Sequence, residues 1–285
     1  MDDLSFPGAT ELRAEIQIGR LDIVASDRTD ISVTVRPSNQ GRSGDRSAAE
    51  AVRVDRQGPA VVVTGPFRLN LIGPGDSVDV VVEVPTGTAV SADVKYGSMH
   101  IAGRVGAARL GLPYGELTLD DAERLEVKHG HGGVRVGRVD GDAEVTTKSG
   151  SATLRSVGGA LRLKGSDSAL SVDHVAGPAE LSTSSGSIDI GTAEGAVTVK
   201  AAYGTVRIRH LARGVTRIEG SYSGVHVGVR RGTAVWLDAS SQHGTVRTDL
   251  ASDAGPTEGE DTLELHVRTG YGNISVHRSE APPGA

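Results

Sequence analysis

Short runs of alternating apolar and polar residues recur along this chain, each interrupted by a glycine. Leu125 and Val127 alternate with polar residues before such a glycine, and Leu117 and Leu119 do so after one. An alternation with a period of two is typical of a strand with one buried face. The unit therefore predicts two short strands that meet at a turn. Its clearest copies are VKYGSMHI from Val94, LPYGELTL from Leu112, TKSGSATL from Thr147, STSSGSIDI from Ser182, AAYGTVRI from Ala201, GSYSGVHV from Gly220, SSQHGTVRT from Ser240 and RTGYGNISV from Arg268.

Two columns of residues give the period of this repeat, which is about 18 residues. The turn position is Gly97, Gly115, Gly133, Gly150, Ser168, Gly186, Gly204, Gly224, Gly244 and Gly272. A second column of single apolar residues, in phase with the first, is Val105, Ala122, Val139, Val157, Val175, Ala193, Leu211 and Val229. A repeat this short cannot bury its apolar face alone, so neighbouring copies must stack. We predict an all-β, single-stranded β-solenoid (a β-helix) of about ten coils of ~18 residues, in which the second column fills a third inward corner.

The ends of the chain depart from this period. Residues 1–85 predict irregular strands that cap the solenoid, around 14–23, 31–35, 61–63 and 78–84, with a mobile loop over 37–50. Regular coils follow over 86–277, with a Gly/Pro/acidic loop inserted at 251–261. Residues 278–285 are predicted to be a disordered tail. A cap is expected because an exposed terminal coil offers an unpaired sheet edge.

Composition narrows the functional classes. The chain has 285 residues with 39 Gly, no Cys, 3% aromatic residues and a formal net charge of −6. The lack of cysteine excludes disulfides, thiol catalysis and cysteine-ligated metals. An acidic balance is a poor match to a phosphate backbone, so nucleic acid is not predicted as a partner. The first residues do not resemble a signal peptide and no apolar run is long enough to span a membrane, so we expect a cytoplasmic protein.

Two segments carry a resemblance to a known family. These are FPGATELRAEIQIGRLDIVAS from Phe6 and SVDVVVEVPTGTAVSADVKYGSMHIAG from Ser77, followed by the series of glycine-centred strand pairs. Over about residues 6–276 the chain resembles the bacterial β-strand-repeat family called "putative adhesin", a domain of unknown function. The resemblance implies that the solenoid is right-handed. It implies no catalytic residues, and a surface adhesin would need an export route.

The aromatic residues provide the candidate binding site. All five tyrosines lie at or near one position, just before the turn glycine, and two histidines lie there as well. In stacked coils this position becomes a column along one corner, which is interrupted at Ser149, Asp167 and Ser185. The column either binds a glycan or a protein or is a structural ladder that shields the turns. The candidate partner-binding residues are Tyr96, Tyr114, His131, Tyr203, Tyr222, His243 and Tyr271.

Other candidate chemistry is weaker. His129 and His131 are two residues apart and could share a face, but a zinc site needs more ligands, which only Asp120, Asp121 or Glu123 could supply. Polysaccharide cleavage would need paired carboxylates on one face. The spacings from Asp121 to Asp140 and from Asp173 to Asp189 depart from the period of the repeat. We therefore predict no metal and no cofactor.

The sequence favours a non-enzymatic scaffold or interaction protein, a monomer or small homo-oligomer, that presents a rigid repeated surface to an unknown protein or glycan partner. A carbohydrate-active β-helix enzyme and a surface adhesin remain the alternatives.

Overall fold

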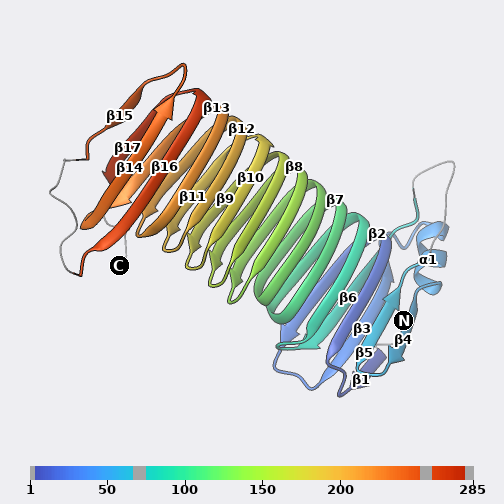
Figure 1. Ribbon diagram of the computed structural model, residues 1–285. Coiled ribbons are helices and arrows are strands. Elements are labelled where there is room, and N and C mark those ends of the chain that lie inside the picture. Colours follow the sequence, from blue (N-terminus) through green and yellow to red (C-terminus); the bar gives the residue numbers. More distant parts are fainter. Residues whose placement is uncertain (1–3, 67–74, 251–258, 280–285) are drawn as a thin grey trace. The chain divides into compact units, whose positions relative to one another are not determined.

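The computed structural model describes residues 4–66, 75–250 and 259–279, and these residues are almost entirely β-structure (Figure 1). Helix α1 (Ser43–Glu50) is the one helix among them. The chain divides into unit 1, residues 1–140, and unit 2, residues 141–285. The predicted all-β, solenoid-like class is confirmed.

Unit 1 is organised around the long strand β2, which pairs with three other strands. Its strands are β1 (Leu4–Pro7), β2 (Glu11–Ser26), β3 (Asp30–Pro37), β4 (Arg53–Gln57), β5 (Ala60–Thr64), β6 (Val78–Pro85) and β7 (Ala89–Val139). On one side β2 pairs in parallel with β5 and β6, with Leu12 opposite Val61. On its other side β2 pairs in parallel with β7, with Leu12 opposite Val90. The first coil of the chain therefore lies between two later ones.

Antiparallel strands flank the coil formed by β5 and β6. Strand β4 pairs antiparallel with β5, and β3 pairs antiparallel with β6 and with β1. These strands satisfy the backbone groups that the β5–β6 coil would otherwise leave exposed at a sheet edge. The strands expected around 14–23, 31–35, 61–63 and 78–84 all lie within observed strands.

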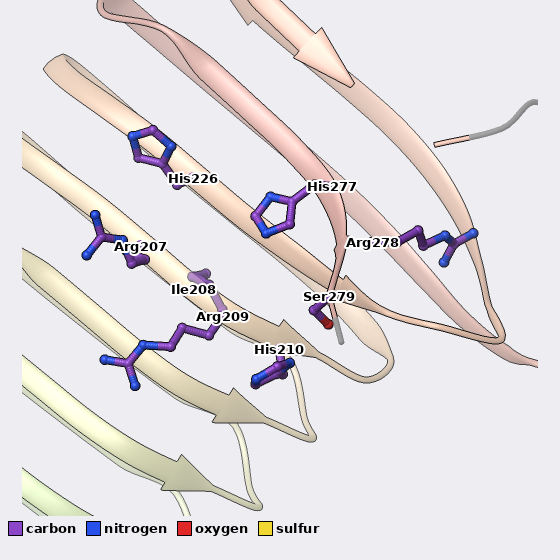
Figure 2. A pocket seen from close by; sticks show the side chains of 8 residues that line it. All are labelled: Arg207, Ile208, Arg209, His210, His226, His277, Arg278 and Ser279. Atoms are coloured by element: carbon purple, nitrogen blue, oxygen red, sulfur yellow. The ribbon is translucent and has the colours of Figure 1, made fainter. Parts of the chain in front are cut away.

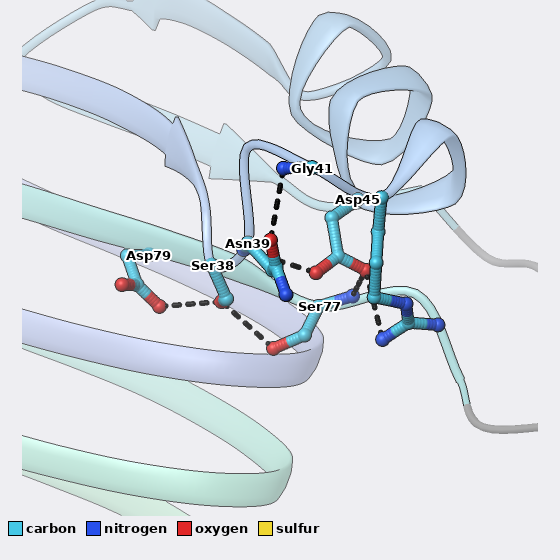
Figure 3. A network of polar contacts seen from close by, with 7 residues as sticks. Ser38, Asn39, Gly41, Asp45, Ser77 and Asp79 are labelled. Carbon is cyan, nitrogen blue, oxygen red and sulfur yellow. Dashed lines mark hydrogen bonds and ion pairs between the residues drawn. The ribbon is translucent and has the colours of Figure 1, made fainter.

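Helix α1 corrects the prediction of a loop over 37–50. Ala48 and Ala49 are buried, and the helix packs against β3 and β6. Asp45 is only 1% exposed, and its carboxylate accepts hydrogen bonds from the backbone N–H groups of Asn39 (3.1 Å) and Ser77 (3.1 Å) (Figure 3). The same carboxylate forms an ion pair with Arg42 at 3.3 Å. The polar composition of the segment concealed this helix, because its anchor is a buried carboxylate rather than an apolar stripe.

Unit 2 begins as a regular stack of parallel coils. Its strands are β8 (Ala143–Val157), β9 (Leu161–Val175), β10 (Ala179–Ser185), β11 (Ile188–Ala193), β12 (Val197–Leu211), β13 (Gly214–Arg230), β14 (Thr233–Ser241), β15 (Val246–Thr248), β16 (Asp261–Tyr271) and β17 (Ile274–Ser279). Ala143, Leu161, Ala179 and Val197 are successive partners in the parallel register, so each lies one repeat after the last.

The last two coils of unit 2 are not stacked in chain order. Strands β16 and β17 pair with β13 on one side and with β14 and β15 on the other (Figure 1). The final coil of the chain is therefore inserted between two earlier ones. Spacing along the chain carries no information about which coil a returning strand joins, so the sequence does not predict this order.

The core is a narrow column of aliphatic side chains. The predicted third-corner residues Val157, Val175, Ala193 and Leu211 pair with one another in sequence order and are fully buried. Each buried Val or Leu stabilises the fold by about 1.5–3 kcal/mol relative to an exposed one. Because neighbouring coils supply both walls of this column, small branched residues fill it and large aromatic rings remain outside.

The turn positions require glycine for a geometric reason. A Cβ on Gly115 would lie 1.6 Å from the carbonyl oxygen of Gly97, and Gly115 has a φ of +140°. The stacking of turn residues on one another also corrects two positions of the predicted turn column. The turn glycine of the third coil is Gly132 rather than Gly133, since Gly132 has φ +127° and stacks on Gly115. In the coil of β13 the residue opposite Gly204 is Ser223 rather than Gly224.

The predicted C-terminal tail begins too early. Arg278 and Ser279 belong to β17 and pair with Val229 and Arg230, and Ser279 is buried. Of the predicted loop over 251–261, Asp261 is already the first residue of β16. The remainder of that tail, and residues 251–258 of that loop, lie outside the described residues.

Candidate functional site

The structure stacks the predicted aromatic residues of unit 1 into a ladder of three rings. The ring centroids of Tyr96 and Tyr114 are 5.0 Å apart, with an angle of 6° between the ring planes. His131 continues the stack at 5.1 Å from Tyr114, with an angle of 12°. These separations follow the distance between neighbouring parallel strands, about 4.8 Å. We call these three residues the unit 1 ladder.

Unit 2 carries a second ladder of four rings, which follows the order of the sheet and not of the chain. Tyr203 stacks on Tyr222 at 5.1 Å, and Tyr222 stacks on Tyr271 at 4.7 Å. His243 then stacks on the other side of Tyr271, at 4.4 Å. Tyr271 takes this place because β16 is inserted beside β13. Tyr203, Tyr222, Tyr271 and His243 form the unit 2 ladder.

Both ladders stand on the surface. The five tyrosines are 45–56% exposed, which is high for such large rings. Each ring covers a face of its neighbour, so the solvent meets the ring edges and a row of phenol groups. Stacked aromatic pairs contribute about 0.5–1.5 kcal/mol beyond the area they bury. The ladder therefore presents polar hydroxyls on a rigid apolar support.

The unit 2 ladder ends where small polar residues take over its column. Ser149, Asp167, Ser185 and Tyr203 are successive partners in the parallel register. The predicted interruption of the column is thus present in the structure. The face of Tyr203 that points to the preceding coil lies next to Ser185 rather than against a ring. This face is an additional apolar surface at the end of the ladder.

A shallow polar hollow of about 320 Å³ lies directly before the unit 2 ladder in the same coils. Its lining includes Ala202 and Ser221, the residues that precede Tyr203 and Tyr222. Lys200 and Glu219 also line it, 3.7 Å apart as an ion pair on neighbouring strands. The hollow offers charge of both signs and serine hydroxyls beside the exposed rings.

His129 and His131 do not share a face. His129 is buried at 4% exposure, and its Nε2 lies 3.1 Å from the carbonyl oxygen of Gly115. His131 is exposed and belongs to the unit 1 ladder. The alternation of buried and exposed residues breaks between the two histidines, because Gly130 is buried as well as His129. Within residues 4–66, 75–250 and 259–279, no cluster of three or more His, Asp or Glu side chains is arranged to hold a metal ion.

Two of the four carboxylates considered for catalysis, Asp140 and Asp189, form ion pairs with arginines. Asp140 forms ion pairs with Arg104 (2.8 Å) and Arg138 (2.7 Å). Asp189 does so with Arg209 at 2.6 Å. Asp120 and Asp142 accept backbone N–H bonds from the neighbouring coil, from Gly103 and Ala160 respectively. Most of these contacts join different coils and give the carboxylates a role in the fold.

Sequence reasoning missed Trp236, the single tryptophan of the chain. It lies on β14, is 57% exposed and packs obliquely against His266 of β16, with centroids 5.0 Å apart. His266 lies between two carboxylates, Glu264 at 2.6 Å and Asp238 at 3.5 Å. The sequence carries a signal that could have revealed it. In the alternation of β14, Val235 and Leu237 take the inward positions, so Trp236 between them takes an outward one and places a large ring on the outer face.

Comparison with known proteins places the chain in a family. The family model of the Toastrack DUF4097 domain matches residues 15–280, so the chain belongs to this family. The resemblance inferred from the sequence is thereby confirmed. A search of curated proteins finds no match. In the part of the chain that is described, no helix has the length and apolar character needed to cross a membrane.

Three solved structures are distantly similar. A putative adhesin from Parabacteroides merdae shares 12% identity at a TM-score of 0.39, covering 94% of this chain and 95% of its own. A putative adhesin from Bacteroides fragilis shares 12% at 0.37, covering 96% and 95%. A putative cell adhesion protein from Clostridium sporogenes shares 9% at 0.20, covering 97% and 99%. These likenesses are too distant to support a function.

Proposed function

We propose that this protein is a non-enzymatic binding protein and that the unit 2 ladder contacts a partner protein. The observation that carries the proposal is the exposed stack of Tyr203, Tyr222 and Tyr271, whose rings are parallel within 5°. We further propose that the ladder stands on a right-handed solenoid with coils of about 18 residues. The protein acts as a monomer or small homo-oligomer. The regular parallel registers of β8, β9 and β10 support that coil size.

The physical argument is preorganisation. A tyrosine side chain has two rotatable torsions, and stacking on one face of Tyr203 and on both faces of Tyr222 and Tyr271 already restricts them in the free protein. Binding therefore costs little further side-chain entropy, which otherwise amounts to about 0.5–1.5 kcal/mol for each immobilised side chain. Tyrosine also supplies apolar area and a hydroxyl in one residue, which is why it is enriched among interface residues with large energetic effects.

The mixed charge of the hollow beside the ladder favours a protein as the partner. The side chains of Lys200 and Glu219 are 64% and 65% exposed and face each other across two strands. A partner side chain of either charge can be accommodated there, and the serines can donate or accept hydrogen bonds. Ring edges beside mixed charge are the composition of a protein interface, with aromatic groups in the centre and polar groups at the rim.

A glycan is the second candidate, and one observation favours it. A sugar ring packs on the face of an aromatic ring, and stacking hides most faces of the ladder. Among the tyrosines of the unit 2 ladder, Tyr203 alone keeps a face without a stacked ring, the one beside Ser185. Among these tyrosines glycan binding would therefore depend on Tyr203, whereas protein binding would depend on the edges of several rings.

The experiment is a selection of displayed peptides on the wild-type chain alone, followed by titration of the selected peptides into the wild type and into a Y222A/Y271A variant. We expect selected peptides to bind the wild type at least ten-fold more tightly than this variant, as measured by isothermal titration. Trp236→Ala is the matched control, because it removes an exposed ring outside the ladder. Peptides that bind the ladder variant as tightly as the wild type would contradict the proposal.

A glycan array probed with the wild type, Tyr203→Ala and Tyr271→Ala separates the two candidates. Glycan binding that Tyr203→Ala abolishes, and that Tyr271→Ala leaves intact, would replace the protein partner by a sugar. Circular dichroism of each variant verifies that the fold is retained.

A further inference from the structure

A second hollow of unit 2, on strands β12, β13 and β17, has a lining that is strongly basic. Its volume is about 460 Å³. The basic side chains that line it are Arg207, Arg209, His210, His226, His277 and Arg278. They come from three neighbouring strands, of which β12 and β17 lie far apart in the sequence. No part of the proposed protein-binding function uses this surface.

The hollow arises at a register shift between β12 and β13. In β12 the two residues Arg209 and His210 lie opposite the single residue Gly228 of β13, which is a bulge in β12. Gly228 pairs on its other side with His277 of β17. A Cβ on Gly228 would lie 2.0 Å from the carbonyl oxygen of Arg209. The middle strand therefore has no side chain at this level, while both flanking strands carry basic ones. Bulges and strand glycines commonly mark such sites.

The bases outnumber the acids that lie against them. Asp189 binds Arg209 at 2.6 Å and approaches Arg207 at 3.9 Å. Asp249 accepts a hydrogen bond from the backbone N–H of Arg278 at 3.0 Å. Three guanidinium groups against two carboxylates leave one positive charge in excess before any histidine is protonated. The hollow thus has a positive potential that favours an anion.

Two buried polar atoms of the hollow have no hydrogen-bond partner among the described residues. They are Nδ1 of His210 and Oγ of Ser279, and Ser279 is only 6% exposed. A buried polar atom without a partner destabilises the fold, so a ligand that supplies the missing partner is favoured. Figure 2 shows Ser279 and His277 near the centre, with His210 below them. A ligand with several acceptor oxygens would satisfy His210 and Ser279 together.

The arginines can reach such a ligand. In Figure 2, Arg207 and Arg209 extend away from the centre on one side and Arg278 on the other. The side chains of Arg207 and Arg209 are 56% and 50% exposed, so they can change rotamer at low cost. The guanidinium of Arg278 now donates to the backbone carbonyls of Arg230 (3.1 Å) and Thr233 (2.8 Å). Guanidinium groups match the oxygens of phosphate and sulfate in pairs.

We infer that this hollow binds a tetrahedral oxyanion, phosphate or sulfate, either free or as an ester on a larger ligand. His210, His277 and Ser279 hold its oxygens at the centre, and the arginines close over it from both sides. The site is independent of the tyrosine ladders, so either proposal can fail while the other stands.

Isothermal titration of the full chain with inorganic phosphate, inorganic sulfate, glucose 6-phosphate and acetate tests this inference. We expect saturable binding of phosphate or sulfate with a Kd of about 1 mM or lower, and weaker binding of acetate, which has fewer oxygens. Tighter binding of glucose 6-phosphate than of inorganic phosphate would identify an ester as the ligand, and the reverse order a free anion.

Variants locate the binding. H210Q/H277Q and Arg278→Gln should each lower the affinity for the anion at least ten-fold. His174→Gln is the matched control, because His174 occupies the column of His210 two coils away and pairs with Glu194. Addition of phosphate should also shift the ¹⁵N resonance of His210 Nδ1 in the wild type. The inference is overturned if no oxyanion binds saturably up to about 10 mM, if acetate binds as tightly, or if the double variant binds as the wild type does.

Discussion

The two units insert a coil in the same way but complete the coil beyond it differently. In unit 1 the β5–β6 coil is flanked by antiparallel strands and helix α1, and its inward residues Val63 and Val80 are buried. In unit 2 the β14–β15 coil has β16 and β17 as its only strand partners within the described ranges. Its inward residues Val235 and Leu237 are only half-buried.

This difference separates what stacking stabilises from what a cap stabilises. A coil with neighbours on both sides buries its apolar residues completely, whatever their order in the chain. A coil with a neighbour on one side needs antiparallel strands or a helix to do the same. Substitutions at matched positions should therefore have unequal costs, which the following predictions test.

The largest contrast is expected between two leucines that face each other. Leu265 of the inserted strand β16 is fully buried and pairs with the half-buried Leu237 of β14. Leu265→Ala should lower the free energy of unfolding by about 2–5 kcal/mol, because it leaves a cavity between two coils. Leu237→Ala should cost less than half as much. Urea denaturation followed by circular dichroism measures both, and equal losses would contradict the inserted order.

The anchor of helix α1 should have the next largest effect. Asp45→Ala leaves the backbone N–H groups of Asn39 and Ser77 without their acceptor, at a cost of about 1–3 kcal/mol. Asp55→Ala is the matched control, since Asp55 is exposed on β4. Hydrogen exchange of residues 43–50 should accelerate in the first variant and stay unchanged in the second. Unchanged protection in both would mean that Asp45 does not hold the helix.

A smaller, pH-dependent effect is expected at His210 of unit 2. Burial, and then the positive charges of Arg209 and His277, lower the pKa of His210 below its ordinary value of 6.5. The unfolded chain therefore binds this proton more readily, so stability falls as the pH drops through 6.5 toward the lower folded value. His210→Gln should flatten the decline in stability over this range. A decline as steep in the variant as in the wild type would place the acid sensitivity elsewhere.

The sequence predicts repeated features better than singular ones. Alternation and spacing located the inward residues and most of the aromatic column, since each coil imposes the same constraint on its copy of the repeat. The insertion of β2 and of β16 leaves no such trace, because a parallel neighbour of either origin accepts the same apolar residues. Helix α1 depends on one carboxylate, and the basic hollow depends on a bulge opposite Gly228. Neither a single buried charge nor a register shift has a period that could be detected.

The ladders extend the comparison to function. Tyr96 is the first ring of the unit 1 ladder, and Tyr203 is the first ring of the unit 2 ladder. The polar hollow of about 320 Å³ adjoins Tyr203. If rings alone were sufficient, both ladders would bind the same ligands. If the hollow contributes, binding belongs to unit 2.

The most direct measurement is isothermal titration of a peptide selected on the wild type into the wild type, Tyr222→Ala and Tyr114→Ala. These two substitutions remove the corresponding inner ring of each ladder. The account predicts that Tyr222→Ala weakens binding at least ten-fold and that Tyr114→Ala leaves it unchanged. Equal affinity for all three proteins, with the fold of each intact, would contradict the claim that the unit 2 ladder is the binding surface.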